Sequence, residues 1–135
     1  MRIRSRQKAR ELLGIIVLGF CALLTLALVS HHGLDPSSNV SSPASHYENY
    51  VGKVGARISD ILYHIFGLSA LLLPIPLLLV GYRQIRTQPL EHALVKLFGF
   101  CLGIVALSAG LSLSPIPLPN WVNFTPGGIS GIRIG

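Results

Sequence analysis

The sequence predicts an all-α membrane protein, in which a polytopic bundle of helices shows three spans and the N-terminus is cytoplasmic. Half of its 135 residues are hydrophobic and only 12% are charged, whereas about 25% of the residues in an average soluble domain are charged. The basic residues are gathered in the first ten residues and between residues 83 and 96. This distribution is typical of a polytopic membrane protein rather than of a nucleic-acid-binding domain.

Three segments are long and apolar enough to cross a bilayer, which takes roughly 20 residues. The first is residues 12–29, which carries no charged side chain and would cover about 27 Å as a helix. The second is residues 58–82 and the third is residues 94–113. The first segment also resembles a cleaved signal peptide, but its apolar core is longer than the usual roughly 7–15 residues. We therefore expect it to be retained as a span.

The positions of the basic residues predict the orientation of the spans. Lys and Arg are dense in residues 1–11 and again around residues 83–93, so the positive-inside rule places both segments in the cytoplasm. Residues 30–57 and the Pro/Gly-rich residues 114–135 then face outward. The chain that follows the last predicted span is too short for another one, since a span needs roughly 20 apolar residues. We expect the natural protein to continue into a fourth span.

Two prolines, Pro74 and Pro76, interrupt a run of leucines inside the second predicted span. Each removes a backbone donor and clashes with the carbonyl four residues back, but neighbouring helices and local adjustments can satisfy the freed carbonyls in lipid. We expect the two prolines to kink the span in its cytoplasmic half as a packing feature. A hinge for alternating access would need a second interrupted span in a matching position.

The polar residues near the spans suggest one cluster and no reactive centre. Asp60 and His64 stand four residues apart and share a helix face, and Arg57 is close by. An interfacial polar cluster and a proton relay are both open, because ionisable groups in a span are functional candidates. We predict no catalytic, metal-binding or nucleic-acid-binding residues. In the third span Gly99 and Gly103 form a GxxxG motif that favours close packing, either within this chain or with a second copy.

The run of residues 51–86 carries a spaced set of glycine, small, acidic, proline and aromatic residues. They are Gly52, Gly55, Ala56, Asp60, Phe66, Gly67, Ser69, Ala70, Pro74, Gly81, Tyr82 and Arg83. A Gly-Gly-x-x-Gly follows later, beginning at Gly127 and Gly128. In this order the features resemble the N-terminal membrane domain of the FtsK/SpoIIIE family of DNA translocases, in which the glycine motif opens the fourth span.

The resemblance implies a membrane anchor in a bacterial inner membrane, enriched at the division septum, for a protein of cell division and chromosome segregation. It implies other divisome membrane proteins and the lipid bilayer as partners, and homo-oligomer formation. The ATPase motor of the family is not found in this sequence, so we expect no enzyme activity and no cofactor here. ATP, Mg²⁺ and DNA would belong to that motor. A small membrane transporter or channel subunit is the alternative function.

Overall fold

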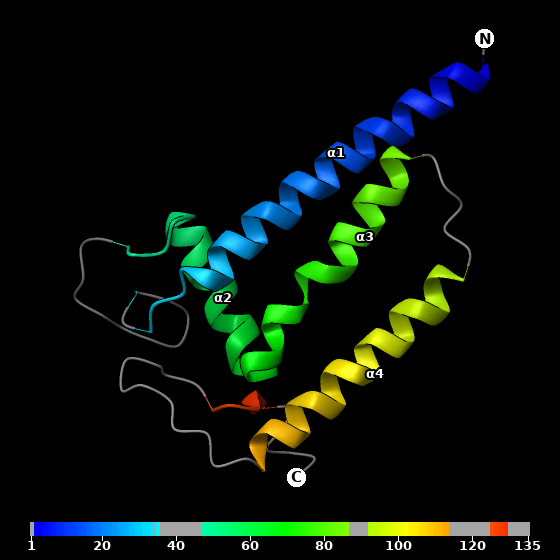
Figure 1. Cartoon of the computed structure of the whole chain (residues 1–135). Coiled ribbons are helices and arrows are strands. Elements are labelled where there is room, and N and C mark those ends of the chain that lie inside the picture. Colours follow the sequence, from blue (N-terminus) through cyan, green and yellow to red (C-terminus); the bar gives the residue numbers. More distant parts are fainter. Residues whose placement is uncertain (1, 34, 36–46, 87–91, 114–124, 130–135) are drawn as a thin grey trace.

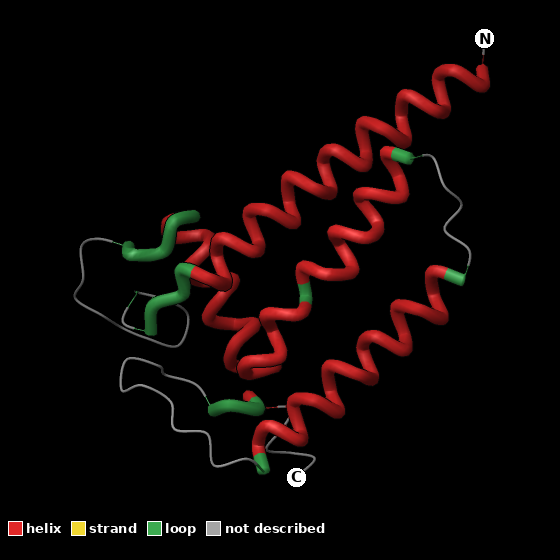
Figure 2. The backbone as a smooth tube through the Cα atoms, viewed as in Figure 1, coloured by secondary structure: helices red, strands yellow, loops and turns green. Residues whose placement is uncertain are grey.

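The computed structural model describes residues 2–33, 35, 47–86, 92–113 and 125–129. Within these ranges the chain is helical and contains no strand, which confirms the predicted all-α fold (Figures 1 and 2). The elements are α1 (Arg2–Val29), α2 (Gly52–Phe66), the 3₁₀ helix η1 (Gly67–Leu72), α3 (Pro74–Ile85) and α4 (Ala93–Ser112).

Within the described ranges two helices are long and apolar enough to cross a membrane alone. They are Gln7–Val29 within α1 and Val95–Ser112 within α4. The segment Gly52–Leu72 followed by Pro74–Ile85 counts as a third candidate if the bent pair is one span. The basic N-terminal residues continue the same helix as the first span, because α1 already begins at Arg2.

The second predicted span bends at its prolines, where the sequence predicts a kink, and Pro74 and Pro76 lie in the first turn of the helix that follows the bend. The axis bends by 55° at the junction before Pro74, and Pro74 stands in the first turn of α3, where a missing N–H costs nothing. In an α-helix residue 74 would donate to the carbonyl of Ala70. Proline has no N–H, and Leu73 donates to that carbonyl instead, over 3.0 Å, which is the bond of a 3₁₀ helix.

The helices α1 and α3 lie side by side and antiparallel (Figure 1). A Cβ atom placed on Gly14 would stand 2.9 Å from the carbonyl oxygen of Gly81 and 2.9 Å from the nitrogen of Ile85. Only glycine permits backbones to approach this closely, as in the small-residue contacts of membrane helices. Farther along α1, the Cys21 thiol donates to the Pro74 carbonyl over 3.2 Å.

The helix α4 packs against η1 and α2 through buried Ile104 and Ser108. Residues 125–129 lie between α4 and η1. The Leu68 N–H donates to the Pro126 carbonyl over 2.9 Å, and the Ser108 hydroxyl donates to the Gly127 carbonyl.

Gly67 and Gly128 have positive φ angles of 59° and 61°. A Cβ on Gly67 would stand 2.6 Å from the nitrogen of Gly128. Gly128 is thus part of a backbone-to-backbone contact with η1, whereas Gly127 lies against α4, where a Cβ atom on it would stand 2.9 Å from the nitrogen of Ser112. Gly131 lies outside the described residues.

Candidate functional site: a polar cap at the end of α1

The C-terminal end of α1 carries the largest group of buried polar contacts in the described part of the chain. The last four carbonyls of any helix lack intrahelical partners, and a carbonyl without a partner is costly where water is scarce. Side chains from two other segments supply the donors here. We call this group the polar cap, and its members are Ser30, His31, Asp35, Asn49, Ser59 and Tyr63.

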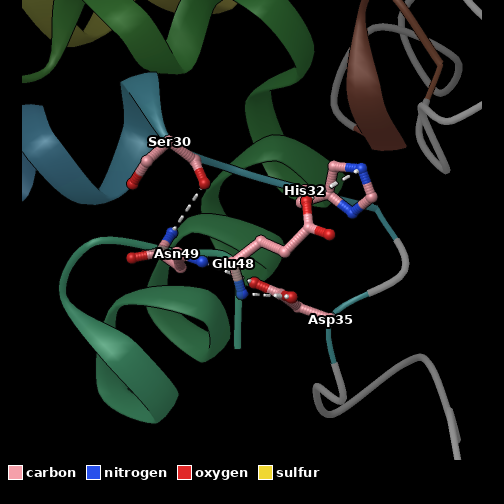
Figure 3. A network of polar contacts seen from close by, with 5 residues as sticks. All are labelled: Ser30, His32, Asp35, Glu48 and Asn49. Carbon is pink, nitrogen blue, oxygen red and sulfur yellow. Dashed lines mark hydrogen bonds and ion pairs between the residues drawn. The ribbon is translucent and has the colours of Figure 1, made fainter. Parts of the chain in front are cut away.

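Asn49 joins the end of α1 to the start of α2 and is 3% exposed. Its Nδ2 donates to the carbonyls of Ala27 and Ser30, over 2.8 and 3.3 Å. Its Oδ1 accepts from the Val51 N–H over 3.0 Å, in the manner of an Asx-turn. One amide side chain therefore ends one helix, through the bond to Ser30 seen in Figure 3, and shapes the turn before the next helix through Val51.

Asp35 fixes the segment that carries Asn49 (Figure 3). Its carboxylate is 4% exposed and accepts from two successive backbone N–H groups, those of Glu48 over 2.9 Å and Asn49 over 3.0 Å. Hydrogen bonds from backbone N–H groups to a carboxylate are charge-assisted and short. At the surface of the cap, Glu48 Oε2 stands 3.4 Å from His32 Nε2.

Tyr63 and Ser59 approach the same end of α1 from α2. The Tyr63 hydroxyl donates to the Leu28 carbonyl over 2.9 Å, and the Tyr63 ring lies against the His31 ring with 4.8 Å between centroids. The Ser59 hydroxyl donates to the Ala56 carbonyl over 3.1 Å and stands 3.0 Å from His31 Nδ1. Since the hydroxyl proton of Ser59 goes to Ala56, His31 Nδ1 is the donor of that second contact.

The predicted cluster of Arg57, Asp60 and His64 is a pair in the structure. Asp60 is 1% exposed, and its Oδ1 stands 3.2 Å from His64 Nδ1. The same nitrogen stands 2.9 Å from the Asp60 carbonyl. Arg57 is exposed, and within the described ranges it forms no ion pair with Asp60.

The predicted GxxxG motif has no partner in the described part of the chain. A Cβ atom on Gly99 or Gly103 would meet no atom within 4 Å. Between α1 and α3 the glycines that support close packing are Gly14 and Gly81, and the sequence did not predict that they meet because they lie in different helices and form no local motif.

Sequence reasoning also missed most of the polar cap. Asp35, Asn49 and Tyr63 lie far apart in the chain and show no periodicity. The turn-forming Asn49 just before a predicted helix was the one local signal that could have indicated a cap. Among the described residues no three His, Cys, Asp or Glu side chains gather in a way that could hold a metal ion. The cap binds the protein's own backbone, and its geometry is that of a structural joint.

Comparison with known proteins gives the chain a family. The family model described as the 4TM region of DNA translocase FtsK/SpoIIIE matches residues 6–135. The DNA translocase FtsK of Shewanella oneidensis is 32% identical over 127 residues, which cover 90% of this chain and 14% of that protein.

Two further relatives carry the same name. The protein of Vibrio vulnificus is 31% identical over 96% of this chain and 14% of its own length, and that of Caulobacter vibrioides is 37% identical over 77% of this chain and 13% of its own length. No solved structure matches the chain.

The chain thus spans about one seventh of the length of these relatives, and the matched part is a membrane region. The glycine contacts of α1 with α3, the long apolar helices and the polar cap agree with such a region. The chain belongs to the family of the 4TM region of DNA translocase FtsK/SpoIIIE.

Proposed function

We propose that this chain anchors a DNA translocase in the bacterial inner membrane and places it at the division septum. The observation that carries the proposal is the family match over residues 6–135. Under this proposal ATP hydrolysis, Mg²⁺ binding and DNA movement belong to parts of the whole protein outside this chain. The role of the chain is to hold position in the membrane and to contact other copies and other divisome proteins.

The distribution of polar groups supports anchoring over transport. The contact of α1 with α3 is lined by Gly14, Leu18, Cys21, Gly81 and Ile85, and these residues carry no charge. The buried carboxylate of Asp35 and the buried amide of Asn49 bind backbone groups at the C-terminal end of α1, and the buried Asp60 carboxylate pairs with His64 of its own helix. A transport pathway needs polar groups along the depth of the bilayer, and the described part of the α1–α3 contact offers none.

The proposal can be tested by exchanging membrane regions between relatives. The matching N-terminal region of the Vibrio vulnificus protein is replaced by this chain, a fluorescent protein is attached, and the fusion is imaged in dividing cells depleted of their own translocase. We expect a band at mid-cell and rescue of division. Uniform membrane fluorescence without rescue would show an anchor with no septal role.

A matched pair of variants checks that the result depends on the fold. Gly14→Leu disrupts the contact of α1 with α3, whereas Gly19→Leu changes a glycine of the same helix that has no atom within 4 Å of its Cβ position. We expect the mid-cell band to be lost in the first variant and kept in the second. A band that survives in both would mean that the folded bundle is not needed for septal placement.

A further inference from the structure

One face of α2 is not covered by the described part of the chain, and the residues on this face change from basic to apolar toward the C-terminal end of the helix. The exposed residues of this face begin with two basic residues and continue with apolar ones; they are Lys53, Val54, Arg57, Ile58, Ile61 and Ile65. We call this set the outward face of α2. Its opposite face is buried and carries small and polar residues, namely Gly55, Ala56, Ser59, Asp60 and Tyr63.

The contacts of α2 show that it crosses the end of α1 and does not run beside it. Asn49, just before α2, bonds Ala27 and Ser30. Tyr63, near the end of α2, bonds Leu28. The whole length of α2 therefore stays at the last turn of α1.

The helix α3 behaves in the opposite way. Pro74 at its start bonds Cys21, and Ile85 at its end meets Gly14, so α3 follows α1 along its axis. The segment Gly52–Leu72, which is α2 with η1, meets α3 at an angle of 55°, and Figure 1 shows α2 lying across the end of α1. Spanning helices are tilted by about 20° on average. With α3 at that tilt, the segment that contains α2 lies at least about 35° from the bilayer normal, so α2 is slanted more steeply than an average spanning helix.

The lengths lead to the same conclusion. The twelve residues of α3 cover about 18 Å, and the six residues of η1 add up to about 12 Å before the bend between the two segments shortens their common depth. Together they approach the hydrocarbon thickness of about 30 Å. The fifteen residues of α2 would add about 22 Å, which the bilayer does not require.

We propose that α2 lies slanted in the leaflet at the C-terminal end of α1, with its outward face in phospholipid and with Lys53 and Arg57 on anionic headgroup phosphates. The segment η1–α3 then makes the crossing alone. Ile61 and Ile65 enter the acyl region, while the basic residues stay at headgroup level, as in interfacial helices. The charge of the face fits this occupant, because both its ionisable side chains are basic and the Asp60 carboxylate is buried on the other side.

The proposal rests on the chain's membership in a membrane family and not on septal placement, so the mid-cell experiment cannot decide it. The full chain is prepared with Cys21→Ser and Cys101→Ala, and single cysteines are introduced at Val54, Ile58, Ile61 and Ile65. Each is spin-labelled in vesicles of phosphatidylethanolamine and phosphatidylglycerol. Label depth is read from accessibility to oxygen and to a water-soluble nickel complex.

We expect all four labels to lie within about 10 Å of the headgroups. A straight spanning helix would instead separate labels 54 and 65 by about 16 Å in depth, and that result would overturn the proposal. Labels at Ile75 and Tyr82 of α3 are the control, and they should differ in depth by about 10 Å. Spin–spin broadening at position 58 that disappears on dilution with unlabelled protein would place a second copy on the face and would also overturn it.

The headgroup contact is tested with the double variant Lys53→Gln/Arg57→Gln. A fluorophore at position 54 should be quenched several-fold more by brominated phosphatidylglycerol than by brominated phosphatidylcholine, and the preference should vanish in the double variant. The control variant Arg83→Gln/Lys96→Gln removes two positive charges elsewhere in the chain and should keep the preference for brominated phosphatidylglycerol. Equal quenching by both lipids in the unaltered chain would rule out the headgroup contact.

Discussion

The two ends of the apolar stretch of α1 are held by different kinds of contact. Near its start, Gly14 lets the backbone of α3 approach to van der Waals distance. At its end, Asn49 and Tyr63 donate hydrogen bonds to the carbonyls of Ala27 and Leu28. The interior of a helix has no free backbone groups and can use close packing alone, whereas a helix end must have its carbonyls satisfied. The position of a contact along α1 therefore decides which residues can make it: glycine in the interior of the helix, and side-chain donors at its end.

The largest effect is expected from Gly14→Leu. Its side chain would meet backbone atoms of Gly81 and Ile85 that cannot move without shifting α3. We expect a loss of about 3 kcal/mol in the free energy of unfolding, the upper part of the range for overpacked sites. It is measured by following helix content in detergent during titration with a denaturing detergent. Gly19→Leu is the control on the same helix and should leave the transition in place; equal shifts in both variants would contradict the contact.

The next effect is expected from Asn49→Ala at the other end of α1. It removes the donor to the Ala27 carbonyl and the acceptor for the Val51 N–H. Each buried group left unsatisfied costs about 1–3 kcal/mol, so we expect a loss of about 2 kcal/mol in the same titration. Asn49→Asp keeps the acceptor for the Val51 N–H but turns a second oxygen toward the Ala27 carbonyl, so we expect it to lose at least as much stability as Asn49→Ala. An Asn49→Asp variant as stable as the original would show that the bond to Ala27 contributes nothing.

Tyr63→Phe removes one hydroxyl from the cap and leaves the ring in place. The Leu28 carbonyl would lose the bond from Tyr63 but keep the one from the His31 N–H, at 3.3 Å. We expect a loss of about 1 kcal/mol, the usual net contribution of one hydrogen bond. Hydrogen exchange should become faster at the last turn of α1 and stay unchanged at Gly81. Faster exchange at both ends of α1 would mean that the two ends are not held independently.

The helices could be predicted because they depend on the composition of the sequence, whereas the contacts of the polar cap could not be predicted. Long apolar runs predict helices in lipid, because each unsatisfied backbone group there is costly. The break before Pro74 was predicted as a kink at the prolines, since the missing N–H is visible in the sequence but the 3₁₀ bond of Leu73 is not. The polar cap joins Asp35, Asn49 and Tyr63 through tertiary contacts that no local pattern encodes.

The comparison also separates a structural role from a transport role for Asp60. Asp60→Asn keeps the size of the side chain and one acceptor oxygen for His64, so we expect a small change in stability. Ion permeability of vesicles that contain the chain should be unchanged, because the buried Asp60 carboxylate pairs with His64 of the same helix and the described contact of α1 with α3 carries no charged side chain. The measurement is proton flux reported by a pH-sensitive dye inside the vesicles. A flux present in the original and absent in the variant would contradict an anchor-only function.

The smallest effect on folding is expected from Gly103→Leu, although a GxxxG motif predicts a packing contact there. The described residues place no atom within 4 Å of its Cβ position, and exposed substitutions usually change stability by less than about 0.5 kcal/mol. Leucine also has a helix propensity better than that of glycine by nearly 1 kcal/mol. The unfolding transition should therefore stay in place or rise slightly, in contrast to Gly14→Leu.

A measurement of self-association shows whether the face of α4 that carries Gly99 and Gly103 contacts a second copy of the chain. Energy transfer between donor-labelled and acceptor-labelled chains in vesicles is compared for the original and for Gly103→Leu. If the face meets a second copy, transfer falls while the unfolding transition does not, because small residues are needed only where two backbones approach closely. If transfer is unchanged, the face meets lipid or another protein. A GxxxG motif thus shows that a helix can pack closely against another helix. Whether it does so depends on a backbone that lies against it, as α3 lies against Gly14 of α1.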